Sequence, residues 1–76
     1  KDWKEAIANW REYLKYESNK ESVVQTKFLL ANAYEMQENL KTAYNIYYSI
    51  LGEYPNTKVI QNRINSIYIR RVARKR

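Results

Sequence analysis

The sequence contains no cysteine and no histidine, and only one glycine and one proline among its 76 residues. Without cysteine, disulfides and thiolate nucleophiles are excluded, and without histidine the chain also lacks an imidazole base and the usual zinc-finger ligands. So little glycine and proline argues against a loop-rich protein or a β-sandwich. No apolar run approaches the roughly 18 residues of a membrane-spanning helix. At this length the chain forms one small domain.

The sequence also lacks a catalytic constellation. Acid–base chemistry would have to use aspartate, glutamate, lysine or tyrosine, and no carboxylate pair lies on an apolar helix face where burial could raise its pKa. No glycine-rich phosphate loop is present. We therefore expect no enzymatic activity, and we expect neither a cofactor nor a metal ion.

The formal charge of +6 is concentrated in the C-terminal segment. Residues 1–56 contain seven basic and eight acidic side chains, whereas residues 57–76 contain seven basic and no acidic ones. A basic segment of this kind can contact the phosphates of nucleic acid or of anionic lipid. Cations near the C-terminus of a helix also interact favourably with its dipole, without any ligand. The predicted basic patch consists of Arg63, Arg70, Arg71, Arg74, Lys75 and Arg76.

Four segments carry apolar residues at steps of three and four, which is the pattern of an amphipathic helix. No segment alternates as a strand does, and the short connections imply that neighbouring helices run antiparallel. We therefore predict an all-α fold of about four helices. The second segment is apolar on more than one face, so we expect it to pack on two sides as the central helix. The segments are residues 1–17, 20–37, 40–54 and 57–76.

Polar residues between these segments predict the helix ends. Ser18 and Glu21 match a capping box at the start of the second helix. Asn39 tolerates a left-handed backbone and can cap the third helix, and Asn56 can cap the fourth. Pro55 ends the third helix, because proline disfavours a helical residue before it.

The two halves of the chain share an internal pattern. The period from Ala6 to Ala43 is 37 residues, which lies in the range of helical solenoids. Trp3 and Trp10 share one face of the first helix, and stacking against a preceding helix is favoured there over a ligand site. The paired positions are Trp3, Ala6, Trp10, Leu14 and Tyr16 in the first half with Leu40, Ala43, Tyr47, Leu51 and Tyr54 in the second, and the last pair is one step off this period.

The second unit resembles a tetratricopeptide repeat, a helix-turn-helix unit of about 34 residues. Lys27 departs from that pattern, because a large apolar residue is usual there, and Ser18 stands where the first unit would have its final proline. The stretches "WKEAIANWREYLKY" and "FLLANAY", with the lengthened repeat, are similar to bacterial envelope members of the family, such as outer-membrane-assembly lipoproteins and periplasmic cell-division coordinators. The matching positions are Leu30, Ala31, Tyr34, Ala43, Tyr47, Ile50 and Pro55.

The resemblance implies an α-solenoid fragment of antiparallel helix-turn-helix repeats. Residues 1–17 would be the trailing helix of one unit, residues 20–54 a complete helix pair, and residues 57–76 a further, basic helix. Because stacked repeats do not bury their faces alone, we expect a piece of a longer solenoid, or a chain completed by a partner or by self-association through its end helices. The resemblance also implies a place in the bacterial periplasm or cell envelope.

The resemblance further implies a concave groove in which a peptide, helix or subunit of another protein binds. Asn32 falls where peptide-clamping members carry asparagine, but Phe28 replaces their lysine, so we expect apolar anchoring and not a carboxylate clamp. Phe28 and Leu29 fit equally well as residues that pack against a neighbouring helix outside this sequence. The predicted groove residues are Gln25, Phe28, Leu29, Asn32, Glu35, Met36, Gln61, Asn65 and Tyr68.

The function that follows is a non-catalytic protein–protein interaction or scaffold module. The alternative is binding of nucleic acid or of an anionic membrane through the basic patch, although no named nucleic-acid-binding motif accompanies it.

Overall fold

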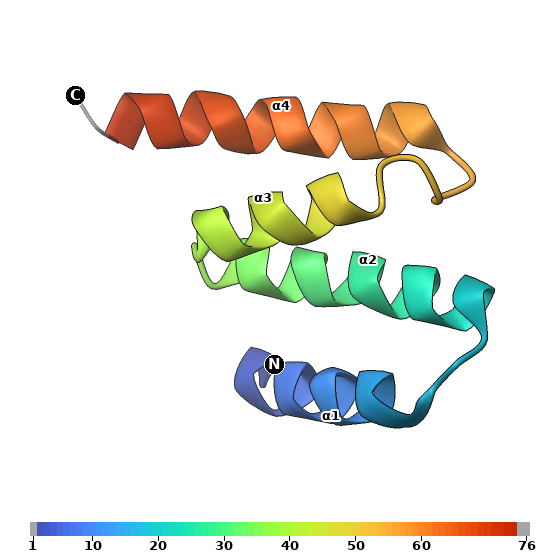
Figure 1. The fold of residues 1–76 in the computed structure, drawn as a ribbon. Coiled ribbons are helices and arrows are strands. Elements are labelled where there is room, and N and C mark those ends of the chain that lie inside the picture. The colour runs from blue at the N-terminus through green and yellow to red at the C-terminus, as the bar shows by residue number, and fades with distance from the viewer. Residues whose placement is uncertain (1, 75–76) are drawn as a thin grey trace.

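The computed structural model describes residues 2–74 and contains four α-helices (Figure 1). α1 spans Trp3–Tyr16, α2 spans Lys20–Met36, α3 spans Leu40–Ser49 and α4 spans Thr57–Arg74. No strand occurs among the described residues. The predicted all-α fold of four helices is confirmed.

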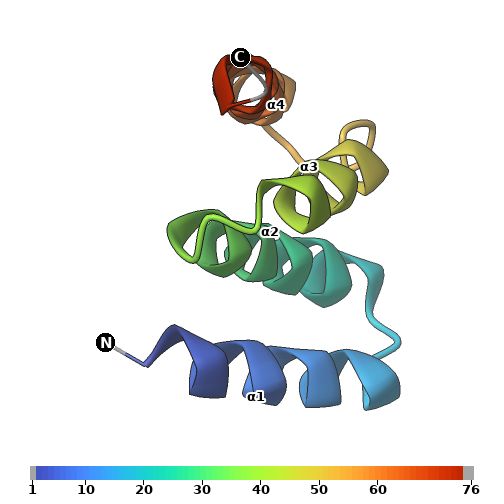
Figure 2. The same ribbon diagram turned by 90° about the vertical axis from the view of Figure 1, so that its left-hand side faces the viewer.

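Consecutive helices run antiparallel and stack in chain order (Figure 1). Within residues 2–74, each helix backbone approaches only the helices that neighbour it in sequence. The result is an elongated stack of 41 × 28 × 17 Å. Seen roughly down the axis of α4, α3 lies to one side of the line that joins α2 and α4 (Figure 2).

α2 begins at an asparagine cap. The side-chain oxygen of Asn19 accepts a hydrogen bond from the backbone N–H of Ser22 at 2.9 Å. The predicted capping box of Ser18 and Glu21 is therefore wrong by one position. Asparagine caps a helix as well as serine does. The Glu17 carboxylate already accepts from the Asn19 N–H at 2.8 Å, so no reciprocal glutamate is needed.

α2 ends in a Schellman motif. The N–H groups of Glu38 and Asn39 donate to the carbonyls of Glu35 and Tyr34, at 3.0 and 2.9 Å. The left-handed residue is Glu38, with a φ of 62°, and not Asn39 as predicted. Asn39 occupies the N-cap position of α3 but makes no side-chain capping hydrogen bond. Ion pairs from the Glu38 carboxylate to α4 offset the cost of its left-handed backbone.

α3 ends at Ser49, although its apolar pattern predicts a helix that continues to Tyr54. Beyond Ser49 the backbone tightens into turns, in which the N–H groups of Glu53 and Tyr54 both donate to the carbonyl of Ile50. Gly52 lies inside this stretch and is a poor helix former. The helical hydrogen-bond ladder therefore stops one turn early, while the apolar side chains still point inward.

The connection from α3 to α4 stays packed on the core. The ring of Tyr54 stacks on that of Phe28, with the ring centroids 4.6 Å apart. The predicted cap of α4 is confirmed, because the side-chain oxygen of Asn56 accepts from the backbone N–H of Val59 at 3.3 Å.

Two hydrophobic clusters use different faces of α2, as predicted for the central helix. One joins α2 to α3 and α4, and the other joins α2 to α1. Ala31 and Ala43 are fully buried, and their small side chains let α2 and α3 approach closely. The first cluster consists of Val24, Ala31, Leu40, Ala43, Tyr47, Ile50, Ile60 and Ile67. The second consists of Ile7, Leu30 and Ala33.

Trp3 and Trp10 pack against this second cluster, within the chain. Their predicted stacking on a preceding helix is therefore wrong. The two rings flank Ile7 on a single apolar stripe, and Ile7 is buried against α2. Because α1 has only this one stripe, the tryptophans face the same neighbour as Ile7 does.

Replacing Ile67 with alanine is expected to lower the free energy of unfolding by about 2–5 kcal/mol, because the fully buried side chain would leave a cavity. Ile69 provides a matched control on the same helix, since its side chain is 66% exposed. Ile69→Ala should change the stability by less than about 0.5 kcal/mol. Urea unfolding followed by circular dichroism measures both, and equal losses would contradict the burial of Ile67.

Candidate functional site

The predicted groove residues of α2 divide into an exposed set and a packed set. Gln25, Leu29 and Met36 are exposed and follow one another along one helix face. Leu29 and Met36 are 43% and 63% exposed, so this face presents apolar surface. Phe28 is half-buried, with its ring centroid 5.9 Å from that of Tyr47. It packs within the chain and not against a helix outside it.

Glu35 is the buried polar centre of the molecule. Its side chain is 5% exposed, and its Oε2 accepts from Arg63 and Arg70 of α4, in the second case at 2.7 Å. Its Oε1 accepts from the hydroxyl of Tyr47 on α3 at 3.1 Å. Burying a carboxylate is costly unless it is paired and hydrogen-bonded, and here both of its oxygens have partners. Glu35 therefore ties α2 to α3 and α4 and does not face an open groove.

The hydroxyl of Tyr47 links Glu35 to Asn32. It lies within hydrogen-bonding distance of the side-chain oxygen of Asn32 as well as of the Glu35 carboxylate. Because a hydroxyl carries one proton, it donates to one of these acceptors at a time. Burial, and then the negative charge of Glu35, raise the pKa of Tyr47 well above its ordinary value. The side chain of Asn32 therefore lies against this network inside the chain.

Arg63 stays positively charged in this network. Partial burial acts to lower the pKa of Arg63, but the charge of Glu35 and the hydrogen bond to it outweigh that effect and raise the pKa. The side chain of Arg63 is 39% exposed, whereas that of Glu35 is 5% exposed. The ion pair is therefore buried at Glu35 and reaches solvent at Arg63.

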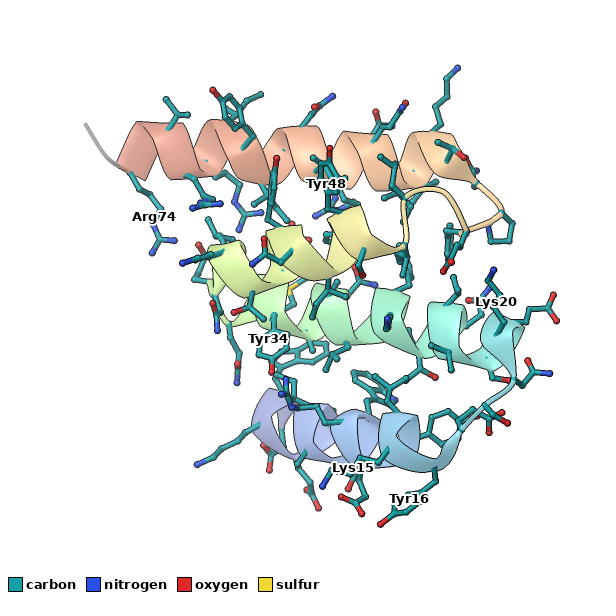
Figure 3. The ribbon with its side chains drawn as sticks, in the orientation of Figure 1. Lys15, Tyr16, Lys20, Tyr34, Tyr48 and Arg74 are labelled. Atoms are coloured by element: carbon teal, nitrogen blue, oxygen red, sulfur yellow. The ribbon has the colours of Figure 1, made fainter. Side chains whose placement is uncertain are left out.

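A second, more exposed carboxylate continues the network at the end of α2. Arg70 donates to Glu38 Oε2 at 2.8 Å, and the guanidinium of Arg74 lies 3.6 Å from Glu38 Oε1. Figure 3 shows Arg74 extending from α4 toward the turn that follows α2. Three arginines of the predicted basic patch, counting Arg63, therefore form ion pairs with α2 or with the turn that follows it.

The remaining patch residues behave differently. The guanidinium of Arg71 lies over the ring of Tyr44, 5.7 Å from its centroid, as in a cation–π contact. Lys75 and Arg76 lie outside the described residues. Much of the positive charge that the sequence concentrates in α4 is thus matched by contacts within the fold.

The predicted groove residues of α4 lie on a different side from those of α2. Arg63 and Arg70 mark the face of α4 that points toward α2. Gln61, Asn65 and Tyr68 are each two positions away from one of these arginines, which is about 200° around a helix. The structure therefore does not bring the α2 set and the α4 set together on one surface.

The sequence model of the family DUF6340, described as a domain of unknown function, matches residues 1–72 of the chain. The chain belongs to the DUF6340 family. No curated protein and no solved structure matches it significantly. The family match includes the whole Glu35 network, from Asn32 to Arg70.

Neither a cluster of potential metal ligands nor a membrane-spanning helix occurs within residues 2–74 of the DUF6340 domain. No three acidic side chains in this range come together as a metal site would require. None of its described helices has the length and apolarity needed to cross a bilayer.

Sequence reasoning did not find the Glu35 network. Its signal was present in the spacing of Arg63 and Arg70, which are seven residues apart and so share a helix face. That face adjoins the stripe of Ile60 and Ile67, both fully buried. Two cations beside a buried stripe require an acid on the opposing helix, and Glu35 lies on the buried face of α2.

Glu35→Gln is expected to lower the stability of the DUF6340 domain by about 1–3 kcal/mol, because it leaves Arg63 and Arg70 without their buried counter-charge. This expected loss of stability is smaller than the loss on breaking a fully buried ion pair, since the side chains of both arginines are more than one third exposed. Hydrogen exchange should accelerate in α4 more than in α1. Glu53→Gln, which breaks only the exposed pair with Lys20, is the control and should cost less than about 0.5 kcal/mol.

Tyr47→Phe is expected to cost about 1–2 kcal/mol at neutral pH, because it removes the hydroxyl that bonds Asn32 and Glu35. The raised pKa of Tyr47 means that the folded state holds the phenol proton more tightly than the unfolded state does. This contribution is complete below a pH of about 10, the ordinary tyrosine pKa, and is lost as the pH rises beyond it. The stability gap between wild type and Tyr47→Phe should therefore narrow above that pH. Urea titrations measure both stabilities, and a difference between wild type and Tyr47→Phe that widens as the pH rises would contradict the hydrogen bonds of the Tyr47 hydroxyl.

Proposed function

We propose that this DUF6340 domain is a non-catalytic helical-repeat module of tetratricopeptide type that binds a helix of another protein. Antiparallel helices whose backbones approach only those of their sequence neighbours are typical of such modules. The buried Ala31 and Ala43 and the fully buried Tyr47 also occupy the positions where the repeat pattern needs small and aromatic residues.

A shift of 37 residues relates the two halves in space as well as in sequence. It carries Ile7 of α1 to Tyr44 of α3, and Leu30 of α2 to Ile67 of α4. Leu30 packs in the cluster with Ile7, and Ile67 packs in the cluster that Tyr44 joins. The packing of α4 on α3 therefore repeats the packing of α2 on α1.

The same shift identifies a face of α4 that has no cover within residues 2–74. On α2 the corresponding face belongs to the core shared with α3, and its members are buried or half-buried. We call the equivalent surface of α4 the end-helix face. It consists of Gln61, Asn65, Tyr68 and Val72, which correspond to Val24, Phe28, Ala31 and Glu35.

Exposure of the end-helix face is the observation that carries the proposal. Tyr68 is 61% exposed and Val72 is 41% exposed. Both line a hollow of about 220 Å³ together with Tyr44 and Arg71. Two tyrosines, a valine and an arginine around one hollow have the composition of protein interfaces, where tyrosine and arginine are enriched. A partner helix placed here would lie on α4 as α3 lies on α2.

The proposal extends to the compartment. Because the repeat pattern resembles bacterial envelope members of the tetratricopeptide family, we propose that the partner belongs to a bacterial envelope complex. Fractionation of native cells checks this point, and a signal confined to the cytosol would contradict it.

Tyr68→Ser is expected to weaken binding of the partner at least about tenfold, since a central interface tyrosine contributes about 2 kcal/mol or more. A photo-crosslinking residue at position 68 of the native protein identifies the partner, and a titration with the purified partner then measures the affinity. Tyr16→Ser is the matched control, because Tyr16 is 80% exposed on α1, at the other end of the stack. If both substitutions leave the affinity unchanged, the end-helix face is not the binding surface.

A further inference from the structure

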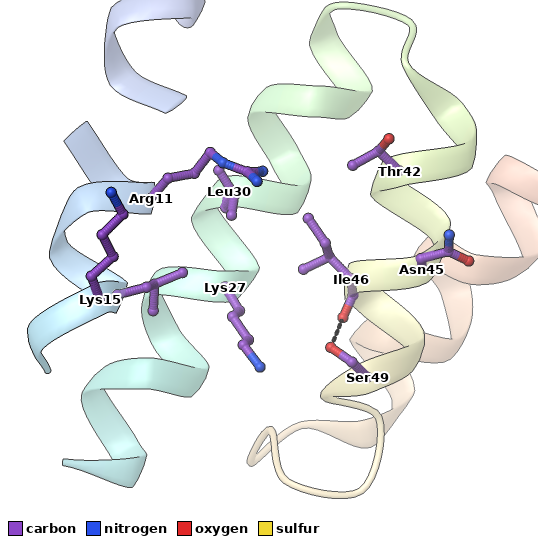
Figure 4. Close-up of a pocket in the computed structure, with 9 residues that line it drawn as sticks. Arg11, Lys15, Lys27, Leu30, Thr42, Asn45, Ile46 and Ser49 are labelled. Carbon is purple, nitrogen blue, oxygen red and sulfur yellow. Dashed lines mark hydrogen bonds between the residues drawn. The ribbon is translucent and has the colours of Figure 1, made fainter. Parts of the chain in front are cut away.

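A groove of about 570 Å³ lies between α1 and α3, with α2 as its floor (Figure 4). Its apolar part is formed by Leu14, Leu30 and Ile46, one from each helix. It is separate from the end-helix face, because no residue of α4 lines it. The full lining is Arg11, Leu14, Lys15, Lys27, Leu30, Thr42, Asn45, Ile46 and Ser49.

The two walls of the groove differ in charge. Arg11 and Lys15 stand on the α1 wall, and Lys27 rises from the floor (Figure 4). The α3 wall is polar and uncharged, with Thr42, Asn45 and Ser49. The groove therefore contains three cations and no carboxylate.

These cations are poorly matched within the fold, unlike the arginines that contact Glu35 and Glu38. Arg11 donates to the uncharged hydroxyl of Tyr34 at 2.7 Å, which holds the guanidinium in place without neutralising it. Lys15 pairs only with Glu12, at 3.3 Å, and both side chains are at least 60% exposed. Such a surface pair contributes little.

Lys27 is the most informative of the three. It is half-buried, and within residues 2–74 no carboxylate lies within ion-pair distance of its amine. A large apolar side chain here would extend the floor that Leu30 and Ile46 form. The aliphatic stem of a lysine can cover part of that floor, but its amine has no carboxylate partner among the described residues. It would gain a counter-charge from an acidic ligand in the groove.

The spacing of the lining residues fits a helical ligand. Thr42, Asn45, Ile46 and Ser49 follow a three- and four-residue rhythm along two turns of α3, a length of about 10 Å. Both α1 and α3 run antiparallel to α2 and therefore parallel to each other. Two parallel walls over an apolar floor receive the apolar stripe of an amphipathic helix.

We propose that this groove binds an acidic amphipathic helix of another protein. Apolar side chains of the ligand pack on Leu14, Leu30 and Ile46, while its carboxylates face Arg11, Lys15 and Lys27. The inference rests on the proposed function as a protein-binding module, but it assigns a second surface and a specific ligand chemistry.

The probe is a fluorescent synthetic peptide of about 18 residues, long enough to form a helix. It carries leucine at the three- and four-residue spacing of one face and glutamate on the flanking positions. In one control peptide every glutamate is replaced by glutamine, and in another the leucines are dispersed around the helix. The intact protein should bind the acidic amphipathic peptide at least about tenfold more tightly than either control, and the affinity should fall as salt rises from about 50 to 200 mM.

Two triple variants separate a local site from overall charge. Arg11→Gln, Lys15→Gln and Lys27→Gln together should weaken binding by about 10- to 100-fold, at about 2- to 5-fold for each cation. Lys4→Gln, Lys41→Gln and Lys58→Gln remove the same charge from exposed positions that do not line the groove. That control variant should bind the peptide nearly as wild type does. Circular dichroism confirms that both variants are folded.

Amide chemical-shift mapping on the wild-type protein locates the peptide. Shifts centred on Leu14, Leu30 and Ile46 support the groove, whereas shifts centred on Tyr68 and Val72 overturn it while leaving the proposed function intact. Equal losses in the two triple variants, or equal binding of the glutamine peptide, also overturn it. Displacement of the peptide by a short DNA duplex on the same residues would reassign the groove to nucleic acid. Loss of partner binding in Tyr68→Ser tests the proposed function separately, because Tyr68 does not line the groove.

Discussion

The carboxylate of Glu35 is the one buried charge on which the arrangement of α2, α3 and α4 depends. The backbone of α4 approaches only α3, so nothing but side chains connects it to α2. Arg63 and Arg70 make that connection by converging on Glu35. A hydrophobic contact allows a helix to slide or rotate, whereas a buried ion pair with a tyrosine hydroxyl beside it fixes the rotation of α4. The face that α4 presents to solvent is set by this one acid.

The rotation of a helix about its own axis is also the quantity that the sequence predicts least well. Helix existence, order and approximate ends follow from apolar spacing, and all four helices were predicted on that basis. A shift of one residue in aligning α4 with α2 turns the predicted face by about 100°. Tyr68 was predicted to face a concave groove for this reason, although it lies on the side of Tyr44 and Arg71. The contacts of Arg63 and Arg70 with Glu35, together with the burial of Ile67, distinguish the two alignments.

Charge in the sequence likewise differs from charge on the folded surface. The arginine-rich segment of α4 is the most basic part of the chain, yet Arg63, Arg70 and Arg74 are matched by acids from α2 and the turn after it. Residues 1–56, which include Lys15 and Lys27, are close to neutral overall, so a count of charged residues does not single these lysines out. Folding brings them together with Arg11 around an apolar floor that no carboxylate lines. Pairing across helices, and not composition, decides where cations without a carboxylate partner on another helix gather on the described surface.

The separation of the core into two clusters has a spectroscopic consequence. Both tryptophans of the chain belong to the cluster that joins α1 to α2, while the cluster that holds α4 contains none. Intrinsic tryptophan emission is therefore a local probe of α1 and is blind to the departure of α4. Far-ultraviolet dichroism registers all four helices. Disagreement between the two signals in a melting experiment would resolve the order in which the ends of the stack come apart.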